Sequence, residues 1–508
     1  MPTLKIKRAL ISVFYKDNLE PIIHQLGKAG VEFISTGGTQ EFIEKLGYAV
    51  TPVEKLTGFP SIFGGRVKTL HPNVFGGILF RRDDEGDLKQ SSAYEIQPID
   101  LVIVDLYPFE ETLAKGGTEE EIIEKIDIGG ISLIRAAAKN HKDVLIVSSR
   151  DQYSALLDIL KGSDCTCSLK ERRHFAALAF DVTSHYDSAI FSYFNTPVII
   201  PSFKKSIPHG RSLRYGENPH QEGKYYGDLD GLFAQLNGKE LSYNNLVDVD
   251  AAVHLVREFM GETAFVIIKH TNACGVATGR STKEAYLKAY QADTVSAFGG
   301  VLATNQPIDV EAAEEINKLF FEILIAPAYH PQALEILKSK KNRIILNQKQ
   351  DLQEKKQFKS LLNGVIEQDL DLKTDSHSDL KVVTRRSPTD SETMALLFAS
   401  KICKHTKSNT IVLAVNGQLI SSGVGQTSRV DALKQAIEKA RTFGFELKGS
   451  VMASDAFFPF PDCVEIAHQQ GIDVVIQPGG SVKDQDSIRY CDDNNMAMVF
   501  TGIRHFKH

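Results

Sequence analysis

The first 150 residues alternate short β-branched apolar runs with amphipathic stretches, and this alternation constrains the fold more than any other feature. Such runs have the length and composition of buried strands, and the stretches between them have the apolar spacing of helices. The predicted strands are residues 9–14, 31–35, 101–109 and 144–149. The predicted helices are residues 19–30, 39–47 and 131–141, and Asp17 with Glu20 forms a capping-box pattern before the first of them. Strands that alternate with helices predict βαβ units and a mostly parallel α/β sheet.

A segment rich in Pro, Ser and Lys at residues 195–211 interrupts this pattern, and we place a domain boundary near residue 200. The second half mixes strands and helices, and Asn416-Gly417 between two strand-like runs predicts a β-hairpin. The polar stretch at residues 338–392 contains the second expected connection. No repeat is readable in the sequence. The predicted domains are residues 1–199, 200–378 and 379–508.

Charge and cysteine usage favour small-molecule ligands inside the cell. The chain has 58 Lys and Arg against 64 Asp and Glu, a net charge of −6, and no basic block of the kind that binds nucleic acid or a membrane surface. Its six cysteines are sparse, which suits a reducing compartment. No run approaches the roughly 20 apolar residues of a spanning helix, and the N-terminus lacks the apolar core of a signal peptide. We expect a cytoplasmic protein without nucleic-acid or membrane partners.

Three glycine-containing segments in the first 150 residues have features of an anion site. The first, residues 33–47, is predicted to run from a strand through a turn into a helix. Gly37 and Gly38 allow the backbone to approach an anion, and Thr36 and Thr39 add hydroxyls at a helix N-terminus that favours phosphate. A tight turn without a ligand is an equally good interpretation of this segment alone.

The other two segments supply cations. The second, residues 64–72, contains Arg66 and Lys68. Two cations in a short loop can also simply be solvated by water. The third, residues 127–141, begins with an acid and two glycines and places Arg135 and Lys139 on one helix face. Because all three segments follow strands of one βαβ series, together they predict a crevice for an anionic ligand. The absence of a G-x-x-x-x-G-K-[ST] motif argues against an ATP-hydrolysing P-loop.

In the second half, Lys269 and His270 end an apolar strand. An imidazole titrates near neutral pH and an ammonium stabilises developing negative charge, as acyl or formyl transfer requires, but a surface Lys-His pair is the simpler alternative. Residues 213–221 concentrate Arg, Tyr, Glu, Asn and His in one loop, which favours ligand binding. Residues 454–460 combine an acid with the adjacent Phe457 and Phe458, which either pack in a core or stack on a flat ligand.

A catalytic metal is not expected. His220 and Glu222 resemble one half of a zinc-deaminase motif, but the P-C-x-x-C half occurs nowhere in the chain. Cys165 and Cys167 are separated by one residue and have no second ligand pair near them in the sequence.

The order of these motifs identifies a family. The segments are STGGT, GRVKTLHP, DLYPF, IDIGG, RAAAKNH, LRYGENPHQ, LSYNNL, KHTNACGVA, SAFGGV, KSN, GVGQTSR, SDAFFPF, QPGGS and IRHFKH. Over nearly its whole length the chain resembles the bifunctional purine biosynthesis family, which joins phosphoribosylaminoimidazolecarboxamide formyltransferase to IMP cyclohydrolase. The resemblance implies a methylglyoxal-synthase-like cyclohydrolase domain followed by a formyltransferase region of two cytidine-deaminase-like α/β units.

The resemblance also implies ligands and partners. The substrates would be aminoimidazole carboxamide ribonucleotide and 10-formyltetrahydrofolate as co-substrate, then the formamido product, and the final product would be inosine monophosphate. No metal would be required. The protein would be a homodimer with transferase sites built across subunits.

For formyl transfer, the resemblance implies that His270 accepts a proton from the substrate's amino group and that Lys269 stabilises the transition state. Asn409 and Asp462 match other positions at the reacting centre and folate site. The implied ligand contacts are Arg214, Tyr215, Asn245, Gly299, Glu322, Arg429, Phe457 and Arg504.

For ring closure, Lys139 matches the family's usual proton donor or acceptor. The rest of the implied catalytic set is Lys68, Tyr107 and Asp127. The implied nucleotide cradle is Lys16, Thr36, Gly37, Gly38, Thr39, Arg66 and Thr69.

Four positions depart from the family pattern. Phe14 and Tyr15 replace a serine and an aspartate that touch the nucleotide. Asp105 stands where asparagine is common, and its negative charge near an anionic ligand is unfavourable unless a cation is close. Pro461 replaces a common arginine.

Two alternative functions remain open at this stage. In the first, the N-terminal domain is a nucleotide or phosphate sensor and only the transferase is active. The retention of four catalytic positions argues against it: Lys68, Tyr107, Asp127 and Lys139. In the second, the C-terminal fold resemblance indicates a zinc nucleoside deaminase, which would require stoichiometric zinc.

Overall fold

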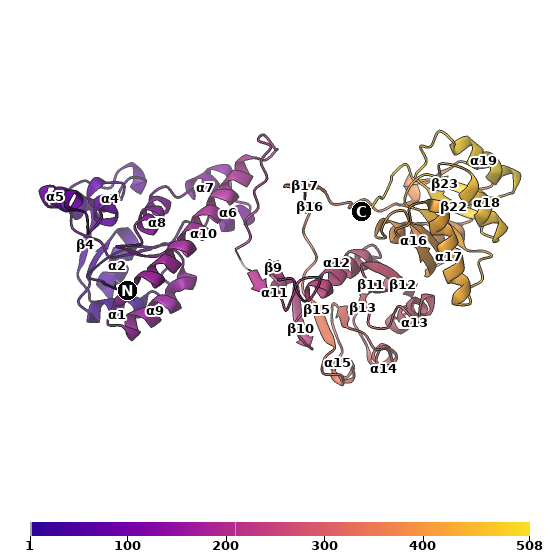
Figure 1. Ribbon diagram of the computed structural model, residues 1–508, viewed down its shortest axis with the longest axis horizontal. Coiled ribbons are helices and arrows are strands. Elements are labelled where there is room, and N and C mark those ends of the chain that lie inside the picture. Colours follow the sequence, from indigo (N-terminus) through magenta and orange to yellow (C-terminus); the bar gives the residue numbers. More distant parts are fainter. Residues whose placement is uncertain (1–2, 209) are drawn as a thin grey trace. The chain divides into compact units, whose positions relative to one another are not determined.

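The computed structural model describes residues 3–208 and 210–508, and these divide into two units, Met1–Pro208 and His209–His508 (Figure 1). Residues 195–208, where the sequence is rich in Pro, Ser and Lys, contain no helix or strand. The expected boundaries near residues 200 and 378 stay predictions.

A parallel sheet of five strands forms the centre of the N-terminal unit and confirms the α/β class for this half. Its strand order is β4-β3-β2-β5-β6. Every residue of the two strands β5 and β6 is buried, as expected where both faces of a parallel sheet are covered. The strands are β2 (Arg8–Ser12), β3 (Glu32–Ser35), β4 (Val50–Pro52), β5 (Leu101–Val104) and β6 (Leu145–Val147), and β1 (Thr3–Lys5) pairs separately with β7 (Thr166–Ser168).

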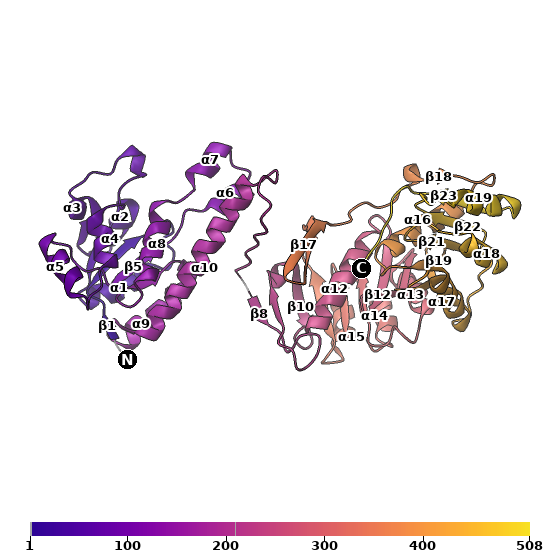
Figure 2. The same ribbon diagram turned by 45° about the horizontal axis from the view of Figure 1, so that its top comes forward.

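Helices connect the successive strands of this unit from β2 to β7, as βαβ units require, and a last helix follows β7. The longest, α10 (Leu169–Phe194), begins at a capping box formed by Ser168 and Glu171 and packs along α8 (Gly129–Lys139) (Figures 1 and 2). The others are α1 (Glu20–Lys28), α2 (Gly37–Lys45), α3 (Val53–Thr57), η1 (Phe63–Gly65), α4 (Pro72–Leu79), α5 (Glu85–Ala93), α6 (Phe109–Ala114), α7 (Glu119–Glu124), η2 (Arg150–Gln152) and α9 (Tyr153–Gly162).

The C-terminal unit contains one sheet of twelve strands. Their order is β10-β15-β14-β13-β11-β12-β20-β19-β21-β22-β23-β18. The strands are β10 (Phe233–Asn237), β11 (Thr263–Lys269), β12 (Asn272–Gly279), β13 (Val301–Thr304), β14 (Ile323–Ala326), β15 (Ile344–Gln348), β18 (Lys381–Val382), β19 (Ile411–Val415), β20 (Gln418–Gly423), β21 (Val451–Ser454), β22 (Val474–Gln477) and β23 (Ala497–Phe500).

The two halves of this sheet repeat one topology. In the first half, the hairpin β11–β12 is antiparallel to β13, which continues into the parallel strands β14 and β15. In the second half, the hairpin β19–β20 stands in the same relation to β21, β22 and β23. The halves join where Ala277 of β12 pairs with Gln418 of β20. This repeat agrees with the expectation of two α/β units, and the predicted Asn416-Gly417 hairpin is confirmed because Val415 pairs with Gln418.

Helices and two small hairpins complete the C-terminal unit. The hairpins are β8 (Gly210–Ser212) with β9 (Lys224–Tyr226) and β16 (Lys356–Leu361) with β17 (Gly364–Asp369). The helices are α11 (Leu229–Leu232), α12 (Tyr243–Arg257), α13 (Thr282–Ala292), α14 (Val310–Ile316), α15 (Pro331–Lys338), η3 (His377–Asp379), α16 (Asp390–Lys404), α17 (Arg429–Thr442), α18 (Asp462–Gln469) and α19 (Asp484–Asp493). Among the described residues of both units, no helix combines the length and apolar character that crossing a membrane needs.

Candidate functional sites

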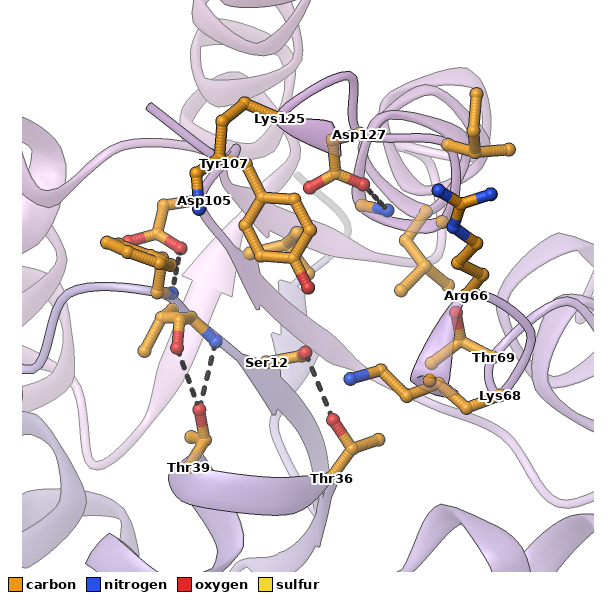
Figure 3. A pocket seen from close by; sticks show the side chains of 18 of the residues that line it. Ser12, Thr36, Thr39, Arg66, Lys68, Thr69, Asp105, Tyr107, Lys125 and Asp127 are labelled. Carbon is orange, nitrogen blue, oxygen red and sulfur yellow. Dashed lines mark hydrogen bonds between the residues drawn. The ribbon is translucent and has the colours of Figure 1, made fainter. Parts of the chain in front are cut away.

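A cavity of about 780 Å³ opens at the carboxyl ends of β2, β3 and β5 in the N-terminal unit (Figure 3). Loops that follow parallel strands meet at one edge of a sheet, so residues far apart in the sequence converge there. The structure brings nine of the predicted residues into the lining of this cavity: Lys16, Thr36, Gly38, Thr39, Arg66, Lys68, Thr69, Tyr107 and Asp127.

The turn between β3 and α2 forms one wall. Gly37 adopts a left-handed conformation (φ +47°), and Thr36 precedes the helix with extended backbone angles. The Thr36 hydroxyl lies 3.4 Å from that of Ser12, and Lys68 extends toward both (Figure 3). The Thr39 hydroxyl donates to the Val13 carbonyl (2.9 Å) and accepts from the Val13 N–H (3.1 Å). Thr39 therefore holds the end of β2, while the N-terminus of α2 faces the cavity with its partial positive charge.

Cations line the cavity from two sides. The Lys16 ammonium donates to the carbonyl oxygens of Val13 and Phe14, the latter at 3.0 Å, and partial burial lowers its pKa. The Arg66 guanidinium forms an ion pair with Glu124, a hydrogen-bonded contact that raises the pKa of Arg66. An entering anion would compete with Glu124 for Arg66.

Asp127 and Tyr107 supply proton-transfer groups. Asp127 is buried, and its carboxylate accepts from the Gly130 N–H at 2.6 Å. Burial raises the pKa of Asp127. Burial and the negative charge of Asp127 also raise the pKa of Tyr107, whose ring extends into the cavity (Figure 3). At neutral pH the Tyr107 phenol therefore keeps its proton and can donate a hydrogen bond.

Lys139 lies elsewhere. It is the exposed last residue of α8, whose first residue, Gly129, lines the cavity. At a rise of about 1.5 Å per residue, the two ends of this helix are about 15 Å apart. Sequence reasoning also missed three lining residues with polar side chains, Ser12, Glu124 and Lys125. Glu124 and Lys125 directly precede the IDIGG motif, and Ser12 lies two positions before Phe14, so position in the sequence is their only signal.

In the C-terminal unit, His270 stands at the tip of the β11–β12 hairpin. Lys269 pairs with Asn272, so His270 and Thr271 form a two-residue turn, with φ +50° and +64°. Such turns usually contain Asn and Gly, and two non-glycine residues with positive φ mark a strained turn. The Asp248 carboxylate of α12 accepts from the Thr271 N–H at 2.7 Å and holds the turn. His270 is exposed at this tip.

Lys269 lies against Gly299. Its ammonium donates to the carbonyl oxygens of Phe298 (2.9 Å) and Gly299 (3.2 Å). Gly299 has φ +69°, and a Cβ atom there would lie 3.1 Å from the Lys269 nitrogen. Two other predicted residues make contacts within the fold. Glu322 forms an ion pair with Lys239 (2.9 Å), and the Asn245 side chain accepts from the N–H of Ser242, the N-cap of α12.

Other predicted site residues lie in the second half of the twelve-stranded sheet, where β19 begins and β21 ends. Ile411 pairs with Ser454, so the start of β19 and the end of β21 coincide. Asn409, just before β19, donates to the carbonyl oxygens of Gln426 and Thr427. Arg429 donates to the Ser454 hydroxyl at 3.1 Å and pairs with the buried Asp455 at 3.3 Å.

The remaining predicted residues follow the parallel strands of that half. Arg504, after β23, lies over the Phe506 ring at 4.4 Å, and Arg429 lies over the same ring at 5.7 Å. Phe457 is partly exposed, and Asp462 begins α18 and accepts from the Cys463 N–H.

Arg214 and Tyr215 belong to the loop between β8 and β9, and the guanidinium lies 5.0 Å from the tyrosine ring centre. In residues 210–508, no hydrogen bond or ion pair connects this pair to Lys269 or His270. In the same described part of the chain and in residues 3–208, no group of three or more His, Cys, Asp or Glu side chains could hold a metal ion.

Comparison with known proteins gives matches along almost the entire chain. A family model described as "AICARFT/IMPCHase bienzyme" matches residues 137–439, and one described as "MGS-like domain" matches residues 18–132. The chain is 61% identical to the bifunctional purine biosynthesis protein PurH of Bacteroides thetaiotaomicron, over 99% of both chains. It is 48% identical to the protein of that name from Aquifex aeolicus and 46% identical to that from Bacillus subtilis, covering 99% of this chain and 100% of each relative. A solved structure titled "Crystal structure of ForH" matches with 32% identity and a TM-score of 0.33, over 37% of this chain and 97% of that one.

Proposed function

This chain belongs to the AICARFT/IMPCHase bienzyme family, and from that premise we propose which of its residues carry each of the two activities. It is a bifunctional enzyme of purine biosynthesis that catalyses the last two steps of IMP formation, formyl transfer and cyclohydrolase ring closure. We assign ring closure to residues 1–199 and formyl transfer to residues 200–378 and 379–508. The observation that carries the first assignment is the gathering of nine predicted residues in one cavity.

Ring closure needs a held conformer and proton movement. The carboxamide nitrogen of the formamido nucleotide attacks the formyl carbon, and water then leaves. The N-terminus of α2 and the nearby cations bind the phosphate. The protonated Tyr107 donates a hydrogen bond to the formyl oxygen as negative charge develops there, and Asp127 and Lys68 move protons. Because Lys139 lies outside the cavity, the proposal gives it no proton-transfer step.

Formyl transfer needs a base and a cation. The substrate's amino nitrogen attacks the formyl carbon of 10-formyltetrahydrofolate, and the bond from that carbon to the folate nitrogen breaks. His270 takes the proton that the amine loses, and the Lys269 ammonium stabilises the negative oxygen and assists the departing nitrogen. The strained turn supports this role, because it holds the imidazole clear of the sheet. Asn409 and Asp462 complete the reacting centre, and the nucleotide and folate are held by Arg214, Tyr215, Asn245, Gly299, Glu322, Arg429, Phe457 and Arg504.

We further propose a homodimer in the cytoplasm. The supporting observation is that Arg214 and Tyr215 have no hydrogen bond or ion pair to Lys269 or His270 within the described part of one chain. A second copy can supply the missing half of each transferase site.

Two substitutions in the full-length protein test the assignment. His270→Ala is expected to abolish formyl transfer and to leave ring closure of supplied formamido nucleotide intact, because the base is removed from one site only. Lys68→Ala is expected to do the reverse. The exposed His377 and Lys89 provide matched controls, and alanine at either should change neither rate.

Equal loss of both activities in either variant would contradict the partition. The sensor alternative predicts that the wild-type protein binds inosine monophosphate but does not close the ring of the formamido nucleotide.

A further inference from the structure

We propose that Phe14 contacts the planar ring of the nucleotide in the N-terminal cavity and that Asp105 is the positioning residue that holds Phe14 there. The proposal rests on the cyclohydrolase function proposed above and adds a ligand contact to it. Phe14 lies in the turn of residues 13–16, which follows β2, and Asp105 directly follows the neighbouring strand β5.

The sheet register places the turn beside Asp105. β2 and β5 are adjacent parallel strands, and Ser12 at the end of β2 pairs with Val104 at the end of β5. The first residues beyond both strands therefore face each other at the edge of the sheet.

Asp105 binds the backbone of the turn with both carboxylate oxygens. One accepts from the Phe14 N–H and the other accepts from the Tyr15 N–H at 3.0 Å. A carboxylate can accept both bonds, whereas an amide presents one oxygen and one NH₂ donor. Burial raises the pKa of Asp105, and the two N–H groups and the nearby Lys16 ammonium oppose this shift. The N–H groups and Lys16 thus offset part of the cost of the negative charge, which weakens the objection that it would repel an anionic ligand.

Other elements fix the rest of the turn. Thr39 of α2 holds Val13 through two hydrogen bonds. The Tyr15 hydroxyl donates to Glu111 of α6 at 2.8 Å, and the Arg150 guanidinium lies 4.4 Å from the centre of the Tyr15 ring. The turn is therefore held on both sides of Phe14.

Phe14 gives this turn an aromatic side chain that remains available to a ligand. It lines the cavity and keeps 43% of its surface exposed. Its ring meets Tyr15 and Tyr107 edge to face, with centroids 4.9 and 5.8 Å away, and the Lys125 ammonium lies 5.8 Å from its centre. An exposed aromatic ring and an anion-binding helix N-terminus in one cavity match the two ends of a nucleotide. Covering Phe14 with a flat heteroaromatic ring removes apolar surface from water and adds a ring–ring contact.

The sequence allows a direct optical test, because the chain contains no tryptophan. Phe14→Trp introduces a single indole into the cavity of the full-length protein. Titration with inosine monophosphate should quench its fluorescence. Phe180→Trp is the control, since Phe180 is 41% exposed on α10 and does not line the cavity. Quenching that is equal in both variants, or absent from both, overturns the proposed contact.

Kinetics test the contact and the positioning role separately. Phe14→Ala should raise the KM of ring closure about tenfold, within the range expected for loss of a base–aromatic contact, with little change in kcat. Phe14→Tyr should retain the wild-type KM. Asp105→Asn should raise KM in the same direction, and the double variant Asp105→Asn, Phe14→Ala should be no worse than Phe14→Ala alone, because Asp105 acts through Phe14.

Asp158→Asn, the same change at an exposed carboxylate of α9, should leave KM unchanged. Losses that add in the double variant, or a wild-type KM in Phe14→Ala, would contradict the inference while the cyclohydrolase assignment stands. Failure of the wild-type protein to close the ring would instead reject the assignment, and the indole titration would still decide whether Phe14 contacts the nucleotide.

Discussion

At the scale of single residues, the chemical type of a side chain was easier to predict than its partner. Thr39 was expected to bind the nucleotide, and the structure uses its hydroxyl to hold Val13. Arg66 was expected in the same cradle, and it pairs with Glu124. Gly299 was expected to contact a ligand. The structure adds two reasons for glycine at this position: its φ is positive, and a Cβ would be in tight contact with the Lys269 nitrogen.

Gly299→Ala tests the last point. Gly299 has φ +69°, and a new Cβ would lie 3.1 Å from the Lys269 nitrogen, so the ammonium must shift by a few tenths of an ångström to admit the methyl group. We expect the kcat of formyl transfer to fall tenfold or more, a loss of at least about 1.4 kcal/mol in transition-state stabilisation. Ring closure by the same protein should be unchanged.

Gly261→Ala is the matched control, because Gly261 also has positive φ (+92°) but open space around it. Both variants should lose about 1 kcal/mol of stability from backbone strain, measured by urea unfolding. A wild-type kcat of formyl transfer in Gly299→Ala would show that the reaction does not depend on the position of the Lys269 ammonium.

At the scale of elements, the sequence predicted strands well and their ends poorly. The apolar runs at residues 9–14 and 101–109 continue past the observed strands, which end at Ser12 and Val104. The residues beyond these ends form the turn and the loop that line the cavity. The predicted capping box before α1 is wrong, since Leu19 is the N-cap and makes no side-chain cap bond. Asp17 instead lies 3.7 Å from Arg150, a partner 133 positions away in the sequence.

His505 binds the segment that follows β23 to residues 370–376, which lie between β17 and η3. Its ring nitrogens lie 2.6 Å from Asp371 and 3.5 Å from Asp375, and the imidazole is buried. Burial alone would lower the pKa of His505, but hydrogen bonds and ion pairs with the two aspartates outweigh it and raise the pKa to about 9. These contacts hold the residue that follows Arg504.

The raised pKa predicts a pH-dependent stability of the C-terminal unit. Since the folded-state pKa lies above the unfolded value of 6.5, the stabilisation is complete below pH 6.5 and is lost as the pH rises through about 9. The full effect is at most about 3 kcal/mol. Urea unfolding of the full-length protein between pH 6 and pH 9.5 should show this decrease, and His505→Gln should remove it.

His377→Gln changes an exposed histidine of η3 and should retain the wild-type pH dependence. If His505→Gln retained it as well, the ion pairs would not be the cause.

At the scale of the whole molecule, the two units have separate sheets and separate apolar cores. The second unit is built from a repeated topology that the family resemblance implied, although no sequence repeat is readable. One apolar cluster contains strand residues of both halves of this sheet. It also contains Phe259, which follows α12, and Phe398 of α16, whose ring centroids are 5.3 Å apart. The two halves therefore share a core.

The proposed homodimer predicts complementation between inactive variants. Arg214→Ala and Lys269→Ala should each lose formyl transfer, because each removes one part of the site. If the parts come from different subunits, a heterodimer contains one intact site of two. Random reassociation of equal amounts should then restore about a quarter of the wild-type rate. Formyl-transfer assays after joint refolding measure this recovery.

The control pair is His270→Ala with Lys269→Ala. Both changes lie on one hairpin, so every mixed dimer has two damaged sites and no recovery is expected. Recovery in neither mixture would place the whole site within one chain.

The sequence alone determined the α/β class, the family and the candidate residues. These depend on local patterns: apolar spacing distinguishes strands from helices, and ordered motifs retain the residue types that the chemistry needs. The hairpin at Asn416-Gly417 was predictable for the same reason, since turn type depends on two adjacent residues.

Only the tertiary structure decided which residues became partners. Asp105 appeared in the sequence as an unfavourable charge, and it became a positioning candidate once β5 lay beside β2 and brought two backbone N–H groups to its carboxylate. Lys139 matched a motif but lies at the far end of α8, because a helix that begins at a cavity carries its last residues away from it. The physical reason is common to both: sequence patterns act over a few residues, whereas hydrogen bonds and charge compensation depend on strands that become neighbours only in the folded chain.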